Sequence, residues 1–188
     1  KPDSLGMGDA ASACVVGAVP AGYGLLGHYL RTDGAFRDGV IIAPVVDGQA
    51  QRRWWEPCRG PLRLSSFNVG MGKLLGVRSS TFCREASEAA LAAAGRTLHD
   101  VDLFICNQST GWFISACRGG LGLPRDKAID TFAELANVGS VASTFNLERA
   151  RQEGKLRDGD LVLSYSPSAG FTRAATVFRW FQRPATSA

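Results

Sequence analysis

The sequence predicts an α/β fold in which helices pack on a sheet. Three observations support this prediction. Val101 to Cys106 is an apolar run typical of a buried strand, a helical pattern from about Ser80 to Ala94 precedes it, and two apolar stretches close the chain. These stretches run from Asp158 to Ser166 and from Phe171 to Trp180. Strands that alternate with helices build a helix-covered sheet. The 188 residues, 45% hydrophobic and 20% charged, are enough to bury a core.

The first third of the chain contains two predicted strands and a long loop. Small and β-branched apolar residues from Ala10 to Val19 predict a buried strand. The stretch from Gly22 to Arg31, followed by the turn signal at Thr32 to Gly34, predicts the start of a hairpin. Residues Ala43 to Asn68 are rich in Arg, Pro, Gly and Gln, which predicts a long irregular loop.

A glycine-rich stretch precedes the first predicted helix. Gly70, Gly72 and Gly76 lack both the G-x-G-x-x-G pattern and the Lys-Ser/Thr ending of phosphate-binding loops, so we expect a flexible turn. The helix that follows is expected to bury one face and to end at Gly95. The residues expected on that face are Phe82, Ala86, Ala89, Ala90 and Ala93.

Two more helices are predicted between the Val101 strand and the closing strands. A short helix begins at about Phe113 and ends at Gly122. The next spans about Ser140 to Glu153 and ends at Gly154. The closing strands meet at a tight PSAG corner, and residues 182–188 are expected to form a frayed tail.

Charge and hydropathy argue against two classes of partner. The net charge of +4 comes from scattered basic residues, which gives little support for nucleic-acid binding. The stretch Arg52 to Trp55 has the composition to stack a purine, but a loop anchored by tryptophan is the preferred interpretation. The longest apolar run, Val40 to Val46, is interrupted by Pro44 and is shorter than the about 20 residues that cross a bilayer. We therefore expect neither a nucleic-acid partner nor a membrane span.

The five cysteines predict neither a disulfide framework nor a zinc site. Their number is odd, they lie far apart, and no C-x-x-C motif occurs. This usage fits a reducing compartment, so we expect a cytoplasmic protein without a bound metal. The chain begins KPDSLGMGDAA, with neither an initiator methionine nor a signal-peptide pattern. We therefore expect it to start inside a domain.

Four motifs follow one another in an order that is typical of one family. They are GDAASACVVG at 8–17, VDLFICNQST at 101–110, the turn at 137–143, and EGKLRDGDLVLSYSPSAGFTRAATVFRW at 153–180. Together they resemble thiolase-fold condensing enzymes, and most closely β-ketoacyl-acyl-carrier-protein synthase III. That family has a Gly-Asp-Gly-Ala strand, a His-Gln-Ala-Asn motif, a Gly-Asn-Thr turn and a Gly-Asp-Leu-Val-Leu strand closed by a Phe-Gly-Ala-Gly loop. The match is weakest between Ala43 and Asn68.

The resemblance implies that the chain is the C-terminal half of a five-layered αβαβα sandwich with a mixed sheet. Residues 1–40 would supply the last strand of the N-terminal half and the lead into the C-terminal half, and residues 41–181 would be that half. In this family a cysteine of the first half receives the acyl group, and the enzyme is a dimer. We therefore expect a partner, either the N-terminal half or another chain, that carries the nucleophile. Acyl-CoA or acyl carrier protein is the expected substrate, with no cofactor.

The expected catalytic residues depart from the family pattern. Asn107 takes the place of the family's histidine, and Thr110 takes the place of the motif's last asparagine. A carboxamide can donate a hydrogen bond to an oxyanion, an effect worth about 3 kcal/mol, but it cannot exchange a proton near neutral pH. Asn107 is thus expected to polarise a thioester without activating a nucleophile. Asn137 matches the family's active-site asparagine if one residue is inserted before Ser143, whereas the ungapped alignment places Ser140 nearby.

The resemblance also implies a set of substrate-binding residues. Ser140, Ala169, Gly170 and Phe113 are expected against the substrate, although core packing is an equally open role for Phe113. Proline and serine replace the Phe-Gly of the family's closing loop.

No other residue is expected to replace the missing base. His28 and His99 lie outside the matching motifs, so structural roles are preferred for both. Cys106 is next to Asn107, but side chains alternate along a strand, so its thiol is expected to turn into the packed layer and to be inert.

Two functions therefore remain open. In the first, the chain is part of an acyltransferase whose cysteine lies outside it, with Asn107 and Asn137 in the oxyanion site. In the second, it is an inactive structural subunit of a heteromeric condensing enzyme. Fold resemblance alone does not choose between them.

Overall fold

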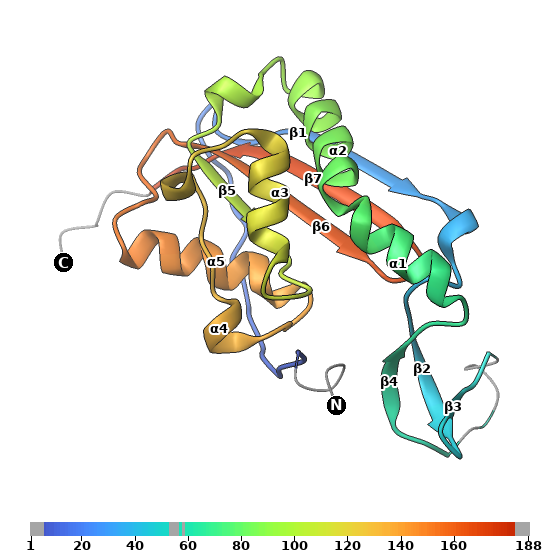
Figure 1. Ribbon diagram of the computed structural model, residues 1–188. Helices are drawn as coiled ribbons and strands as arrows, with labels where there is room; N and C mark the ends of the chain where they lie inside the picture. Colours follow the sequence, from blue (N-terminus) through green and yellow to red (C-terminus); the bar gives the residue numbers. More distant parts are fainter. Residues whose placement is uncertain (1–5, 53–56, 58, 183–188) are drawn as a thin grey trace.

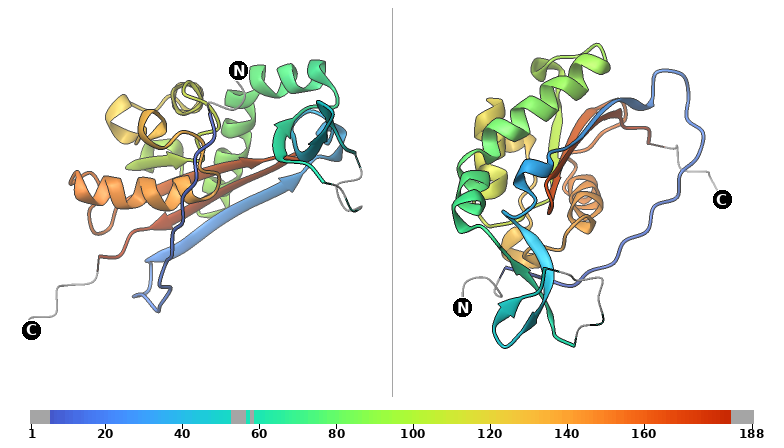
Figure 2. Two further views of the ribbon diagram at one scale, coloured as in Figure 1. Left: turned by 90° about the horizontal axis from the view of Figure 1, so that it is seen from below. Right: turned by 90° about the vertical axis from the view of Figure 1, so that its right-hand side faces the viewer.

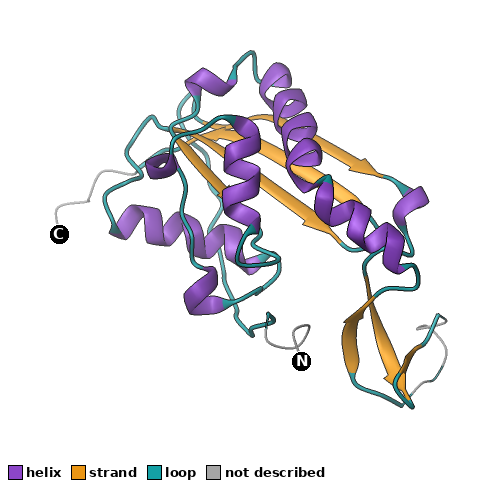
Figure 3. Ribbon diagram, viewed as in Figure 1, coloured by secondary structure: helices purple, strands orange, loops and turns teal. Residues whose placement is uncertain are grey.

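A mixed four-stranded sheet with helices on both faces forms the body of the protein (Figures 1 and 3). This computed structural model describes residues 6–52, 57 and 59–182. Most of the stretch from Arg52 to Trp55, expected to form a loop anchored by tryptophan, lies outside the described residues, and so does the expected frayed tail beyond Gln182. The α/β class predicted from the sequence is confirmed.

The most deeply buried strand of the sheet lies at its edge and is covered on both faces. The strands lie in the order β1 (Gly24–Thr32), β7 (Thr172–Arg179), β6 (Leu161–Ser168) and β5 (Leu103–Cys106). β1 and β6 run antiparallel to β7, whereas β5 runs parallel to β6. All four residues of β5 are buried, as expected for a parallel strand covered on both faces. Phe104 and Cys106 join one hydrophobic cluster, and Leu103 and Ile105 join another.

Helices on the two faces of the sheet enclose these clusters. α2 (Ser79–Ala93) and α3 (Phe113–Leu121) cover one face, and α5 (Val141–Gln152) packs on the other (Figure 1). α2 approaches β1 so closely that a Cβ at Gly27 would lie 2.5 Å from the carbonyl oxygen of Ala90. The predicted face of α2 was partly wrong, because the helix also packs against α3. Its buried residues are Phe82, Cys83, Ala86, Ser87, Ala90 and Leu91, whereas Ala93 is exposed.

Glycines end the three main helices, as predicted. Gly95, Gly122 and Gly154 follow α2, α3 and α5 and have φ values of 63°, 73° and 68°. Such left-handed conformations strain a residue that has a Cβ but not glycine. Short helical turns connect the larger elements. They are η1 (Gly34–Phe36), η2 (Leu98–Asp100), η3 (Arg125–Lys127) and α4 (Phe132–Leu135).

A small antiparallel sheet corrects the prediction of a long loop from Ala43 to Asn68. It consists of β3 (Gln49–Ala50), β2 (Ile41–Val46) and β4 (Leu62–Ser65), in that order. In Figure 1 this arm projects from the body. Turn-forming residues dominate the stretch and obscure the β-branched residues of β2, which favour a strand.

The predicted flexible turn at Gly70 to Gly76 is also wrong, because α1 (Val69–Val77) forms there. The side chain of Asn68 caps this helix by accepting a hydrogen bond from the Met71 amide at 3.0 Å. Gly72 packs against the backbone of residue 39, where an added Cβ would lie 2.8 Å from the Gly39 carbonyl oxygen. At this position glycine permits a close contact within a helix.

The predicted buried strand from Ala10 to Val19 is absent from the described structure. All of these residues are exposed, and the side chains of Val15 and Val16 are 103% and 93% accessible. Figure 2 shows the segment as an extended trace outside the packed layers. A strand needs a neighbouring strand to satisfy its backbone, and no described strand pairs with this one.

The hairpin predicted at Thr32 to Gly34 is replaced by a different pairing. β1 pairs with the distant β7, and Asp33 caps η1 through a 3.1 Å hydrogen bond from the Ala35 amide.

Among the helices that the structure describes, none has the length and apolar character needed to cross a bilayer.

Candidate active site

Asn107 lies where the two parallel strands of the sheet end. Its backbone amide donates to the Tyr165 carbonyl at 3.1 Å and extends the β5–β6 ladder by one residue. Its side-chain Nδ2 donates to the carbonyl of Pro167, at the end of β6, at 3.4 Å. The carboxyl ends of parallel strands are the usual position for ligand sites in α/β proteins. Asn107 is therefore placed where a functional group is expected.

A buried network of side chains fixes the loop that carries Asn107. Gln108 donates to the Ile129 carbonyl at 2.8 Å and accepts from the Thr131 amide at 3.0 Å. The Thr131 hydroxyl donates to Asn146 at 2.8 Å, and the Asn146 amide donates to the Cys106 carbonyl at 3.2 Å. Sequence reasoning missed these positioning residues. Their one signal was a second amide, Gln108, directly after Asn107 at the end of a buried strand.

Two oxygen atoms of the same loop are buried without a hydrogen-bond partner among the described residues. They are Oδ1 of Asn107 and Oγ1 of Thr110. An unpaired buried polar atom costs about 1–3 kcal/mol, so native proteins contain few of them. Both atoms belong to the motif that the sequence singled out.

Asn137 lies in a constrained turn. The preceding Ala136 has φ 56° and ψ −155°, a region that glycine occupies far more easily than alanine. Backbone bonds from Asn137 to Gly6 and from Gly8 to Asn137 hold the turn against the N-terminal segment, at 2.6 and 3.0 Å. The Oδ1 of Asn137 accepts from the Gly139 amide at 3.0 Å. The side-chain oxygen is thus engaged locally, and the amide nitrogen is the end left for a ligand.

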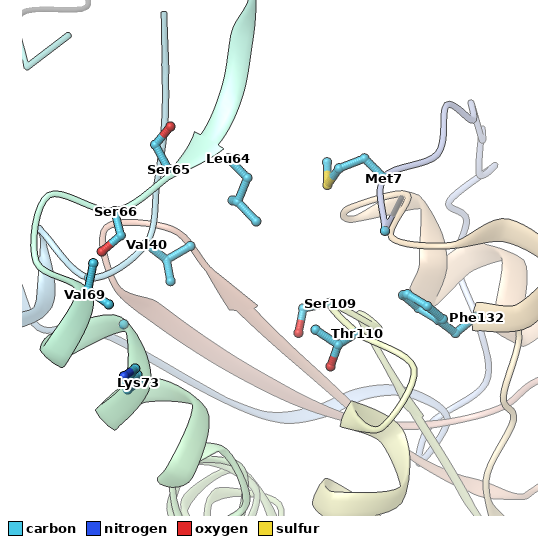
Figure 4. Close-up of a pocket in the computed structure, with 13 residues that line it drawn as sticks. Met7, Val40, Leu64, Ser65, Ser66, Val69, Lys73, Ser109, Thr110 and Phe132 are labelled. Carbon is cyan, nitrogen blue, oxygen red and sulfur yellow. The ribbon is translucent and has the colours of Figure 1, made fainter. Parts of the chain in front are cut away.

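A cleft of about 740 Å³ separates the arm and α1 from the loop after β5 (Figure 4). Its lining residues are Gly6, Met7, Gly39, Val40, Leu64, Ser65, Ser66, Val69, Gly72, Lys73, Ser109, Thr110 and Phe132. In Figure 4, Ser109 and Thr110 lie near the middle of the cleft, between Val40 on one side and Phe132 on the other. Lys73 is the one charged residue of this described lining. The cleft is therefore largely apolar, with hydroxyl groups beside the Asn107 loop.

None of the four predicted substrate-binding residues belongs to the described lining of this cleft, and neither do Asn107 and Asn137. Phe113 is 4% exposed and stacks on Tyr165 with ring centroids 6.4 Å apart, so it packs in the core. Ala169 and Gly170 form the tip between β6 and β7. The Gly170 amide donates to the Val40 carbonyl at 3.2 Å, which places the tip beside the cleft. Ser140 is exposed at the start of α5.

The reactive residues that the sequence set aside also lie away from the cleft lining. Cys106 is fully buried, and burial raises the pKa of its thiol well above the ordinary value, which agrees with an inert residue. His28 is exposed on β1, and His99 belongs to η2. The described residues contain no group of three or more His, Cys, Asp or Glu side chains that could hold a metal ion.

Comparison with known proteins gives one consistent result. A family profile described as 3-Oxoacyl-[acyl-carrier-protein (ACP)] synthase III C terminal matches residues 91–180. The beta-ketoacyl-[acyl-carrier-protein] synthase III of Caldanaerobacter subterraneus is 29% identical over 174 residues, which cover 93% of this chain and 51% of that protein. The Rhizobium meliloti protein of the same name is 28% identical over 184 residues, with the same coverage of both.

Solved structures agree with the sequence matches. The beta-ketoacyl-[acyl carrier protein] synthase III of Thermus thermophilus is 29% identical and superposes with a TM-score of 0.72, over 88% of this chain and 49% of that one. The 3-oxoacyl-(acyl carrier protein) synthase III of Pseudomonas aeruginosa, at 22% identity, has a TM-score of 0.71. The chain spans about half the length of the curated relatives it matches.

Proposed function

This chain is a thiolase-fold protein similar to the C-terminal half of β-ketoacyl-ACP synthase III, and we propose that it forms part of an acyltransferase. An acyl group passes from acyl-CoA or acyl carrier protein to a cysteine outside this chain and then to an acceptor. The observation that carries the proposal is the placement of Asn107 at the ends of β5 and β6, where its backbone pairs with Tyr165 and its side-chain amide is held by Pro167.

The proposed role of Asn107 is to stabilise charge rather than to transfer protons. Its carboxamide has two N–H groups, and the 3.4 Å bond to Pro167 uses one of them. The second can donate to the oxygen of a thioester as charge develops there. A preorganised donor of this kind contributes about 3 kcal/mol to the transition state.

Asn137 is the proposed second donor. The conformation of Ala136 supports this assignment, because the family motif has glycine directly before its asparagine and Ala136 adopts a glycine-like φ of 56°. That register supports Asn137, rather than the exposed Ser140, as the second catalytic residue of the proposal.

The proposed assembly contains a partner that supplies the nucleophile. Large apolar side chains are exposed on the N-terminal segment and on β1, among them Val15, Val16, Leu25 and Leu30. Contiguous exposed apolar surface usually marks an interface. We propose that residues 1–40 supply the last strand of the N-terminal half and the entry to the C-terminal half, which includes β1, and that residues 41–181 form the rest of the C-terminal half.

An inactive structural subunit is the alternative, and one observation favours it. The free oxygens of Asn107 and Thr110 are buried, so the site is closed in this structure. In that case the chain would stabilise an active partner and contact no substrate.

A kinetic comparison tests the proposal on the assembly co-purified through a tag on this chain. The assembly is incubated with octanoyl-CoA, and acyl adducts are followed by intact-protein mass spectrometry for wild type, Asn107→Ala and the control Thr81→Ala. We expect Asn107→Ala to slow adduct formation or turnover by about a hundredfold, the effect of losing an oxyanion donor. Thr81 is exposed on α2 and does not line the cleft, so its substitution should have little effect. If the rates of adduct formation and turnover are the same in wild type and Asn107→Ala, the inactive structural subunit is the better explanation.

A further inference from the structure

Arg173 is the one charged residue among the buried residues that the structure describes. It lies on β7 and is 3% exposed. Its Nη1 donates to Oε2 of Glu85, on α2, at 2.8 Å. Taking a guanidinium out of water is unfavourable, and replacing a buried ion pair by well-packed apolar side chains often leaves stability unchanged or raises it. The burial of this charge therefore favours a role other than stability.

Aromatic rings also hold the guanidinium of Arg173. Its Cζ lies 4.4 Å from the centre of the Phe82 ring and 5.8 Å from that of the Phe171 ring. The rings of Phe36, Phe82 and Phe171 contact one another, with centroids 5.3 to 5.9 Å apart. Cation–π contacts strengthen when the charge is removed from water. The ion pair and the rings together fix the position of the Arg173 side chain between β7 and α2.

The residue opposite Arg173 on the neighbouring strand is Pro167, which holds the side chain of Asn107. Arg173 and Pro167 are cross-strand partners in the β6–β7 ladder. Proline has no N–H, so at this pair β6 cannot donate a hydrogen bond to β7. The Pro167 carbonyl accepts from Asn107 Nδ2 at 3.4 Å, a length at which a small displacement of the carbonyl breaks the bond. The ladder is thus weakest at the pair on which the orientation of the amide depends.

The tip between β6 and β7 also connects the Arg173 cluster to the cleft wall. Phe171, whose ring lies beside the guanidinium, packs in one cluster with Val40, and Val40 lines the cleft. The Gly170 amide donates to the Val40 carbonyl at 3.2 Å. A shift of the start of β7 would therefore be felt both at the cleft wall and at the carbonyl that holds Asn107.

We propose that Arg173 is a positioning residue for Asn107. Its ion pair with Glu85 anchors the start of β7 on α2, and β7 in turn fixes the Pro167 carbonyl that orients the amide. Arg173 contacts no reacting atom, and its whole effect on the reaction passes through Asn107. Loss of the anchor lets the amide turn, which slows the reaction without removing a group that touches the substrate. This inference rests on the proposed acyltransferase function.

A double-mutant cycle distinguishes positioning from a purely structural role. The co-purified assembly is incubated with octanoyl-CoA, and the rates of adduct formation and turnover are measured by intact-protein mass spectrometry. Glu85→Ala removes the anchor at its half-exposed end, and it is made alone and together with Asn107→Ala. Glu88→Ala is the matched control, because Glu88 lies on the same helix and loses a comparable ion pair, of 2.7 Å with the exposed Arg84. Arg173→Met repeats the test without leaving an unpaired charge in the core, and Arg173→Lys tests rescue by a second cation.

We expect Glu85→Ala to slow the reaction about tenfold when Asn107 is present and less than about twofold when it is replaced, because residues that act through one another are not additive. Arg173→Met should show the same pattern, Arg173→Lys should retain more of the rate, and Glu88→Ala should have no effect. Equal slowing in both backgrounds, or no slowing in either, would overturn the inference while leaving acyl transfer intact. If wild type forms no adduct, the proposed function fails, and this inference fails with it.

Discussion

Asn107 shows how one side chain changes the chemistry that a fold can perform. A histidine at the end of β5 could exchange a proton, whereas the carboxamide can only donate and accept hydrogen bonds. The surrounding network of Gln108, Thr131 and Asn146 holds the loop through buried bonds of 2.8 to 3.2 Å, so the amide is kept in place. The residue was recognisable from its motif, but its unpaired oxygen was visible only in three dimensions.

Ala136 carries a local strain that a single substitution can relieve. Its φ of 56° with ψ of −155° favours glycine, so we expect Ala136→Gly to raise the free energy of unfolding by about 1 kcal/mol. Urea unfolding measures the change. The matched control Ala89→Gly, in the interior of α2, should lower stability by about the same amount. Destabilisation by both substitutions would show that the turn at Asn137 is not strained.

The buried thiols predict how stability depends on pH. Burial raises the pKa of Cys106, and a hydrogen bond with Cys83 together with burial raises the pKa of Cys117. The folded protein therefore keeps these protons after the unfolded chain has lost them. This contribution to stability is fully present below the unfolded thiol pKa of about 8.5 and is lost as the pH rises above it.

The measurement is the urea midpoint at pH 7 and at pH 10, for wild type and for the double variant Cys106→Ala with Cys117→Ala. We expect the wild-type midpoint to fall more between the two pH values. Burial also raises the pKa of Tyr165, so part of the decline should remain in the variant. An equal decline in both proteins would contradict the assignment to the thiols.

At the scale of elements, α1 is the clearest difference between sequence and structure. Three glycines in nine residues predicted a turn, yet the helix forms because Asn68 caps it and Gly72 fits closely against Gly39. The contact of Gly72 with Gly39 joins segments far apart in the chain, and local composition carries no record of it. By contrast, α2, α3, α5, β6 and β7 followed from periodicity and from terminal glycines, because those signals are local.

A pair of glycine substitutions separates the two roles of glycine in α1. A Cβ at Gly72 would meet the Gly39 carbonyl oxygen at 2.8 Å, whereas nothing lies within 4 Å of one at Gly76. We expect Gly76→Ala to stabilise the protein by up to about 1 kcal/mol through helix propensity and Gly72→Ala to destabilise it. Thermal unfolding of both variants gives the comparison. If Gly72→Ala proved as stabilising as Gly76→Ala, α1 would not pack as described.

At the scale of the whole molecule, the exposed segment 10–19 is informative. The sequence correctly indicated apolar residues suited to a strand, but the described chain offers no strand to pair with them, and Val15 and Val16 remain exposed. The prediction of a buried strand failed because no described strand lies beside this segment, and periodicity does not report whether a partner strand is present.

Charge placed on this segment tests whether it is an interface. We expect Val15→Asp combined with Val16→Asp to lower the amount of co-purified partner at least about tenfold, because desolvating two carboxylates in an apolar interface is unfavourable. Val77→Asp, on α1 and 81% exposed in wild type, is the control and should have little effect. Partner recovery is measured by quantitative mass spectrometry after affinity purification. Equal recovery with all variants would place the interface elsewhere.

The claim that the acylated cysteine lies outside this chain can be tested directly by locating the adduct. The co-purified assembly is treated with octanoyl-CoA, digested, and mapped by peptide mass spectrometry. The account predicts a thioester on a cysteine outside residues 1–188, with the buried Cys83, Cys106 and Cys117 unmodified. An octanoyl group on Cys106 or on another cysteine of this chain would contradict it.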